Sequence, residues 1–259
     1  MNKFLLLACL IACSCYAEEE TPWLTPFFAF QPKAAFTVET FQESCEAAKW
    51  GTFSLSNTFP DRYGIEIWVV EAWTPEQKGS IDHFGVEGAY QIWDQLQGDP
   101  RTLTAKRVLR QASLWSLSDP ASFHHGKREK ELLLSFGREK FIEQEWTTRW
   151  FGAAKLGIAE QGSPWVQGIC GIERQFQNSH QLSLKMHYLA GLGSRRLSFH
   201  HFNGYGEIAH RSMEFSVGYT YAWSFSGQMH LGYANRLYAK NFPRHWQQYL
   251  LQFIYPFGL

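Results

Sequence analysis

The sequence has no long apolar run, little cysteine and no net charge, and each absence excludes a class of protein. No stretch after residue 17 approaches about 18 consecutive apolar residues, so the chain is not a helical membrane protein. The 24 basic residues balance 24 acidic ones, which gives no electrostatic basis for binding nucleic acid. Three of the five cysteines lie at positions 9, 13 and 15, and only Cys45 and Cys170 follow. No metal-ligand spacing remains, so the sequence predicts no metal site and no cofactor.

The amino terminus has the layout of a secretory signal peptide. Lys3 precedes an apolar run over 4–12, and small residues continue to Ala17. The run is too short for a spanning helix, which needs about 20 residues. We predict cleavage after Ala17, so that residues 1–17 are removed. An alternative stays open, because Leu10-Ile11-Ala12-Cys13 resembles a lipobox; that resemblance implies a periplasmic lipoprotein anchored through acylated Cys13.

Period-two alternation of apolar and polar residues recurs from about residue 50 to the end of the sequence. Such alternation is typical of strands with one apolar and one polar face. In one example, Leu182, Leu184, Met186 and Tyr188 alternate with Ser183, Lys185 and His187. Turn residues divide the chain into twelve candidate strands, with 10 to 14 as the plausible range. They cover 50–58, 63–74, 81–94, 101–116, 129–140, 145–159, 163–176, 180–192, 195–205, 210–223, 226–239 and 246–257.

These strands predict an all-β fold, an antiparallel up-and-down transmembrane β-barrel over residues 50–259. A closed barrel is the one sheet structure whose backbone hydrogen bonds are all satisfied in hydrocarbon. Tryptophans near segment ends agree with rings at the bilayer interface: Trp73, Trp93, Trp115, Trp146, Trp150, Trp165, Trp223 and Trp246. The polar faces supply lumen-lining candidates of mixed sign: Glu87, Arg149, Lys155, Glu173, Lys185, His187, His230 and Arg236.

Residues 18–49 break this pattern, because Pro22, Pro26 and Pro32 interrupt an aromatic stretch. We predict a short N-terminal arm. Three placements are open for it: a plug in the lumen, a segment in the periplasm, or a loose linker.

The carboxy-terminal segment carries a family resemblance. Its aromatic and apolar residues alternate to the last position: Tyr249, Leu251, Phe253, Tyr255, Phe257 and Leu259. This resembles the assembly signal of Gram-negative outer-membrane β-barrel proteins. The resemblance implies export to the outer membrane, contact with the lipid bilayer and recognition by the membrane-insertion machinery. The sequence departs from the usual pattern, with Leu259 in place of a terminal Phe and with Pro256 inside the strand.

One trio has the residue types of a hydrolase. His210, Ser212 and Glu214 share one face of a predicted strand, and the His-x-Ser pair resembles that of outer-membrane lipases and lipid A deacylases. Those families have Asn after the Ser, where this chain has Met213. A polar stripe explains the trio without catalysis, so we predict no enzyme, and a barrel-embedded lipid acyl hydrolase is the alternative.

Adjacent polar residues along the chain give no further site by spacing. His124-His125 and His200-His201 could bind a metal only at a loop or bulge, because adjacent strand residues point to opposite faces. Asp82-His83 receives no role for the same reason. The sequence therefore predicts a narrow diffusion channel or a structural envelope protein, with the solute unknown.

Overall fold

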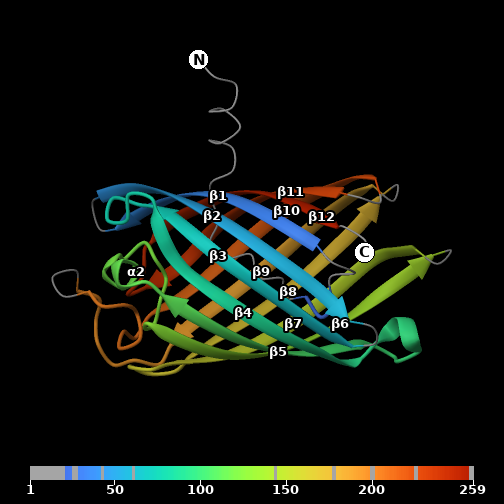
Figure 1. The fold of residues 1–259 in the computed structure, drawn as a ribbon, viewed down its shortest axis with the longest axis horizontal. Helices are drawn as coiled ribbons and strands as arrows, with labels where there is room; N and C mark the ends of the chain where they lie inside the picture. Colours follow the sequence, from blue (N-terminus) through green and yellow to red (C-terminus); the bar gives the residue numbers. More distant parts are fainter. Residues whose placement is uncertain are drawn as a thin grey trace, which may run out of the picture.

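The computed structural model describes residues 21–24, 29–41, 44–59, 62–142, 145–176, 179–198, 202–224 and 227–256. Twelve strands in these ranges form a closed antiparallel barrel in which each strand pairs with its neighbours in sequence and β1 pairs with β12 (Figure 1). The strands are β1 (Ala29–Phe41), β2 (Ser44–Phe59), β3 (Tyr63–Trp73), β4 (Ser80–Trp93), β5 (Thr102–Ala112), β6 (Arg128–Ile142), β7 (Glu145–Ala159), β8 (Trp165–Phe176), β9 (His180–Gly191), β10 (Arg211–Ser224), β11 (Gly227–Lys240) and β12 (His245–Pro256).

The prediction of an arm over 18–49 is wrong for the described residues from 29 onward, because β1 occupies 29–41 and the first part of β2 occupies 44–49. Pro32 was the misleading signal. A proline cannot donate a backbone hydrogen bond, but it is tolerated where a ladder is interrupted. On its β12 side, β1 is paired at Ala29 and Phe30, and its pairing with β12 resumes at Lys33. Pro32 therefore lies where β1 and β12 are not paired. On the β2 side of the strand, Pro32 pairs in register with Phe53.

The predicted strand at 195–205 is also wrong. Within 192–210 the described residues form one isolated bridge, between Arg195 and Ile208. The strand count of about twelve is confirmed, but only because this extra strand compensates for the missed β1.

The two ends of the barrel differ. The two longest connections, 113–127 between β5 and β6 and 192–210 between β9 and β10, lie at the same end, which we call the loop end. The opposite end, the turn end, holds the start of β1, the close of β12 and the connection 94–101 with the short helix η1 (Gln95–Gln97). The other helix, α2 (Leu114–Ser118), belongs to the loop end (Figure 1). Among the described residues, no helix has the length and apolarity that would take it across a membrane.

The outer face of the barrel is apolar and its inner face is largely polar. On β6, the side chains of Leu132, Leu134 and Phe136 are about half exposed, whereas those of Glu131 and Ser135 are buried inside. A soluble barrel would place its apolar residues inside. This reversal fits a barrel whose outer surface contacts lipid.

Charged side chains bound the apolar band on the same strand. Lys130 and Arg138 are both exposed and lie eight residues apart on the outer face of β6. At about 3.3 Å per residue and a tilt of about 40°, they are separated by roughly 20 Å along the barrel axis. That height is close to the ~25 Å apolar band of transmembrane barrels.

A charge placed in the middle of this band tests the lipid-facing assignment. We expect Leu134→Arg to lower the free energy of unfolding in lipid vesicles by about 2–4 kcal/mol, because the guanidinium would lie near the bilayer midplane. Ile142→Arg, at the turn end of the same strand, is the matched control and is expected to cost about 0–1 kcal/mol. Urea titration of refolding into vesicles measures both. Equal costs at the two positions would contradict the assignment.

Candidate functional site

The inner wall formed by β4 to β7 carries acids and bases in contact with one another. The ammonium of Lys106 lies 2.9 Å from the carboxylate of Glu87 on the neighbouring strand. Glu131 on β6 is shared, because Arg110 lies 3.6 Å away on one side and Lys155 lies 3.3 Å away on the other. Since each charge has an opposite charge beside it, the wall is polar but close to neutral.

The eight lumen-lining candidates all lie on inward-facing positions of their strands. Glu87, Lys155, Glu173 and Arg236 are buried, and Arg149, Lys185, His187 and His230 are partly buried. Arg149 forms an ion pair with Glu139, and Arg236 lies 2.6 Å from Glu214.

On β2 and β12, the buried polar side chains that the structure describes carry hydroxyl or amide groups: Thr52, Ser54, Ser56, Gln248 and Gln252. The described inner faces of these two strands thus offer neutral hydrogen-bonding groups, whereas the wall of β4 to β7 carries paired charges.

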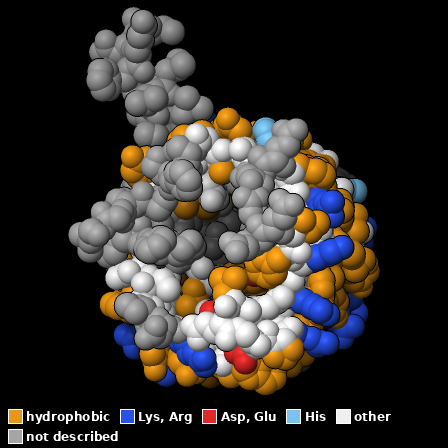
Figure 2. All heavy atoms as spheres, turned by 90° about the vertical axis from the view of Figure 1, so that its right-hand side faces the viewer, with side chains coloured by type: hydrophobic (Ala, Val, Ile, Leu, Met, Phe, Trp, Pro, Cys, Tyr) orange, Lys and Arg blue, Asp and Glu red, His pale blue; other side chains and the backbone are white. Residues whose placement is uncertain are grey.

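Residues 21–24 lie inside the barrel toward the turn end. The hydroxyl of Thr104, an inward residue of β5, donates a hydrogen bond to the carbonyl of Pro22. The indole of Trp23 packs edge-on against Phe151 at 6.0 Å, and the Arg149 guanidinium lies 4.8 Å from the indole centroid. Figure 2 views this end, where described atoms border a hollow and the outside carries mostly hydrophobic side chains, with Lys and Arg side chains among them. The segment narrows the interior on the side of β5 to β8.

The two long connections, 113–127 and 192–210, lie at the loop end, and we call their described residues the mouth segments. Ala121 packs against Trp50 and Val70 on the inner face of β2 and β3. His125 stacks in parallel on Trp165 of β8, with ring centroids 3.6 Å apart. One mouth segment therefore contacts opposite parts of the wall, which narrows the barrel at this end.

The second mouth segment packs on the first through Tyr205, whose side chain is fully buried. Its backbone nitrogen donates to the carbonyl of His124 at 2.6 Å, and its hydroxyl donates to the carbonyl of Pro120 at 2.8 Å. Trp165 and Trp246 are buried in the interior, so the prediction that they lie at the bilayer interface is wrong. Trp165 stacks on His125, and Trp246 lies 4.9 Å from the Arg236 guanidinium. The sequence pattern did not reveal either contact.

The trio His210, Ser212 and Glu214 is held by other partners. His210 is buried, with its Nε2 3.4 Å from the Nε2 of His125 and its Nδ1 3.0 Å from the carbonyl of Ile208. The hydroxyl of Ser212 donates to Glu214 at 3.3 Å. Glu214 in turn accepts two hydrogen bonds from the guanidinium of Arg236, at 2.8 and 2.6 Å. The observed contacts link Ser212 to Glu214, whose carboxylate is held by Arg236, and link His210 to other partners, so they give no support to a His–Ser catalytic pair.

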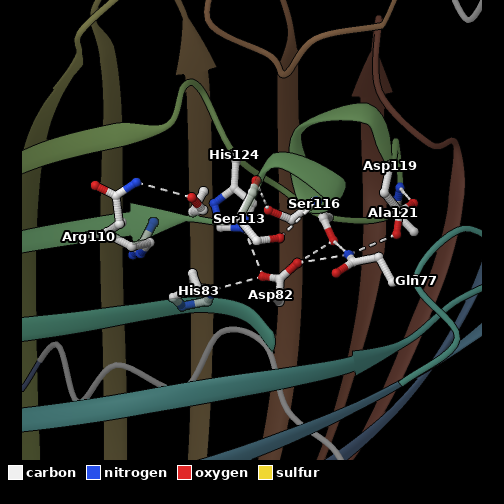
Figure 3. A network of polar contacts seen from close by, with 12 residues as sticks. Gln77, Asp82, His83, Arg110, Ser113, Ser116, Asp119, Ala121 and His124 are labelled. Atoms are coloured by element: carbon white, nitrogen blue, oxygen red, sulfur yellow. Dashed lines mark hydrogen bonds and ion pairs between the residues drawn. The ribbon is translucent and has the colours of Figure 1, made fainter. Parts of the chain in front are cut away.

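A buried polar cluster at the loop end centres on Asp82, and Figure 3 shows it; we call it the Asp82 network. Asp82 and His83 are adjacent on β4, yet both point inside. The register explains this, because Val70 of β3 pairs with His83 and the next residue, Glu71, pairs with Ile81. Asp82 is therefore the extra residue of a β-bulge, which re-aims its side chain. The sequence analysis assigned Asp82 and His83 to opposite faces, and that is wrong.

Each oxygen of the Asp82 carboxylate has its own partners. Oδ1 accepts hydrogen bonds from the Ser122 hydroxyl at 2.6 Å and from the Gln77 amide at 2.9 Å. Oδ2 lies 2.7 Å from Nδ1 of His83 and 2.8 Å from Nε2 of His124. The carboxylate thus joins the β3–β4 connection, β4 and a mouth segment.

His124 lies between two acids. Its Nε2 faces Asp82, and its Nδ1 lies 3.9 Å from a carboxylate oxygen of Glu129. Burial by itself lowers the pKa of His124, but the neighbouring Asp82 and Glu129 carboxylates outweigh it and raise the pKa to about 9. The two acids therefore favour a positive charge at this position.

Some predicted features lie outside the described residues. They are the signal peptide over 1–17 with Cys13, the pair His200-His201, and the terminal Phe257 and Leu259. Of the predicted assembly signal, Tyr249, Phe253 and Tyr255 on β12 are exposed on the outer face.

A closed antiparallel sheet with apolar side chains outside and polar side chains inside is the fold of outer-membrane β-barrels. Solved structures support this fold assignment. The chain is similar to the KdgM porin, at 10% identity over 89% of this chain and 99% of that one, with a TM-score of 0.59. It is similar to the NanC porin, at 7% identity over 88% and 100%, with a TM-score of 0.62. An outer membrane channel from Pseudomonas putida F1 matches at 9% identity over 94% and 100%, also with a TM-score of 0.62. No family model and no curated protein matches the sequence.

Proposed function

We propose that this protein is a narrow diffusion channel of the Gram-negative outer membrane. The observation that carries the proposal is the reversal of faces in a closed barrel: apolar residues outside, and inside a wall of paired charges and neutral polar groups. A twelve-stranded barrel lies between side-chain-filled barrels of eight strands and open porins of about 16. Small polar solutes fit such a passage, and the similar barrels that are named porins or channels support this function.

The proposal includes an orientation and a route to the membrane. Transmembrane barrels have short turns toward the periplasm and longer loops outside the cell. The loop end would then face outward and the turn end would face the periplasm. Export by the signal peptide over 1–17 and insertion through the carboxy-terminal segment, from Tyr249 to Leu259, complete the route.

Locally paired charges lead us to expect weak ion selectivity. The KdgM porin has been described in complex with disordered oligogalacturonate. In the present chain, Lys106, Arg110 and Lys155 each lie beside a carboxylate. A preference for anionic sugars is therefore not part of the proposal.

Planar-bilayer recording tests the channel. We expect purified protein to give discrete current steps with a small reversal potential in a salt gradient. Lys155→Gln should shift that potential toward cation selectivity, because Glu131 loses one of its basic neighbours. Lys130→Gln is the control, since Lys130 is exposed on the outer face of β6. If wild-type protein inserts but gives no current, a structural envelope role replaces the channel.

A further inference from the structure

The interior at the loop end contains an arrangement that conduction does not need. Asp82, His83 and His124 each offer one ligand atom, and these atoms all lie within 4.8 Å of one another. All three side chains are buried. Two residues come from the bulge in β4 and the third comes from a mouth segment, so a ligand held here would join the wall to the segment that crosses the barrel (Figure 3).

We infer that Asp82, His83 and His124 form a binding site for one divalent first-row transition-metal cation, such as Zn²⁺, which fastens the mouth segment 113–127 to β4. Two imidazole nitrogens and one carboxylate oxygen are a common ligand set for such cations. The three protein ligands leave a coordination position for water.

The donor atoms already converge. Oδ2 of Asp82 lies 2.7 Å from Nδ1 of His83 and 2.8 Å from Nε2 of His124. The imidazole planes meet at 78°, so the rings are not stacked on each other. Ligands on a tetrahedral Zn²⁺ lie about 3.3 Å apart, since each metal–ligand bond is about 2.0–2.2 Å. A cation would therefore need these atoms to separate by roughly half an ångström.

Outer contacts orient the ligands as metal sites require. The second oxygen of Asp82 is held by Ser122 and Gln77, which turns Oδ2 toward the two imidazoles. Nδ1 of His124 is buried and has no hydrogen-bond partner among the residues that the structure describes, and the Glu129 carboxylate lies 3.9 Å away. A metal-bound imidazole usually donates its other N–H to a carboxylate, a backbone carbonyl or water. With a cation on Nε2, a small rotation would give His124 that bond, and Glu129 would be the orienting acid.

Charge supports the same conclusion. Glu129 is already paired with Arg110 at 2.8 Å. As an imidazolium between two acids, His124 compensates the buried carboxylate of Asp82. A divalent cation would displace the proton from Nε2 of His124 and take over this compensation, so the site is suited to a cation and not to an anion.

Metal binding to the purified, untagged full-length protein in detergent tests the inference. After incubation with a small excess of Zn²⁺ and desalting, we expect about one zinc per chain by elemental analysis. Co²⁺ should give visible absorption typical of nitrogen and oxygen ligands. Asp82→Asn and His83→Gln should each reduce the bound metal at least ten-fold, in line with loss of a ligand. His187→Gln, which alters an inward-facing histidine of β9, should keep full binding.

The result that overturns the site is wild-type protein with less than about a tenth of an equivalent of metal, or His83→Gln protein that binds as much as wild type. Heat-modifiable migration on a gel confirms that each variant is folded. If Asp82→Asn fails to fold, His83→Gln and the Co²⁺ spectrum decide alone. Binding is measured without any current, so this outcome is independent of whether the protein conducts.

Discussion

The Trp23→Ala variant is expected to conduct about twice as much current per channel as the wild type, because pore diameter governs flow through a narrow passage. The indole packs in the interior against Leu133, Phe151 and Ile169 of β6 to β8. Its removal would widen the passage and would also free residues 21–24 to leave the wall. Single-channel recording in planar bilayers measures the change.

The matched control is Trp150→Ala, which makes the same chemical change on the outer face of β7, where the ring is exposed. Its conductance should equal that of the wild type. A second variant displaces the segment without altering Trp23: a Cβ at Gly137 would lie 2.8 Å from Cγ of Pro22 and 2.9 Å from Cη2 of Trp23. Gly137→Ala should therefore raise the conductance, as Trp23→Ala does. Unchanged currents in both interior variants would show that residues 21–24 do not narrow the path.

The Tyr205→Ala variant is expected to loosen both mouth segments. Truncating a buried aromatic ring typically costs about 3–5 kcal/mol, and here the ring contacts Phe123, Phe202 and Phe242. The strands of the barrel should stay intact, because the lost contacts lie among connections and not in the ladders. Hydrogen exchange over 113–127 and 192–210 should accelerate, while exchange in β6 and β7 should not.

Tyr205→Phe separates packing from hydrogen bonding. It keeps the ring and removes only the hydroxyl that donates to the carbonyl of Pro120. Loss of that hydrogen bond should lower the free energy of unfolding by about 0.5–1.5 kcal/mol. We expect exchange close to that of the wild type. If the amides of the mouth segments exchange no faster in the Tyr205→Ala protein than in the Tyr205→Phe protein, the aromatic cluster does not hold the mouth segments together.

The strands were predictable because alternation is a local property. Leu132, Leu134 and Phe136 face lipid while Glu131, Leu133 and Ser135 face inward, and this order is readable residue by residue. The bulge in β4 also has a local signal in the sequence. The exposed residue Ile81 is at an odd position and the exposed residue Phe84 is at an even one, and such a change of parity within a strand indicates a bulge.

The mouth segments could not be predicted in the same way. The position of His124 depends on contacts with Asp82 and Glu129, and that of Trp165 depends on His125. Those partners come from separate connections and strands, and no periodicity links them. Likewise, β1 is a strand because β12 and β2 pair with it, whereas its own sequence contains a proline.

The pairing of β1 with β12 also constrains how the protein reaches the bilayer. These strands come from distant parts of the chain, so the ladder between Ala29 and Pro256 cannot form until nearly the whole polypeptide is present. Until then the growing sheet has two unpaired edges, which can join to other chains in water and are costly in hydrocarbon. Sealing of the cylinder and entry into lipid should therefore occur in one concerted, slow step, and a chain lacking either edge strand should aggregate during assembly.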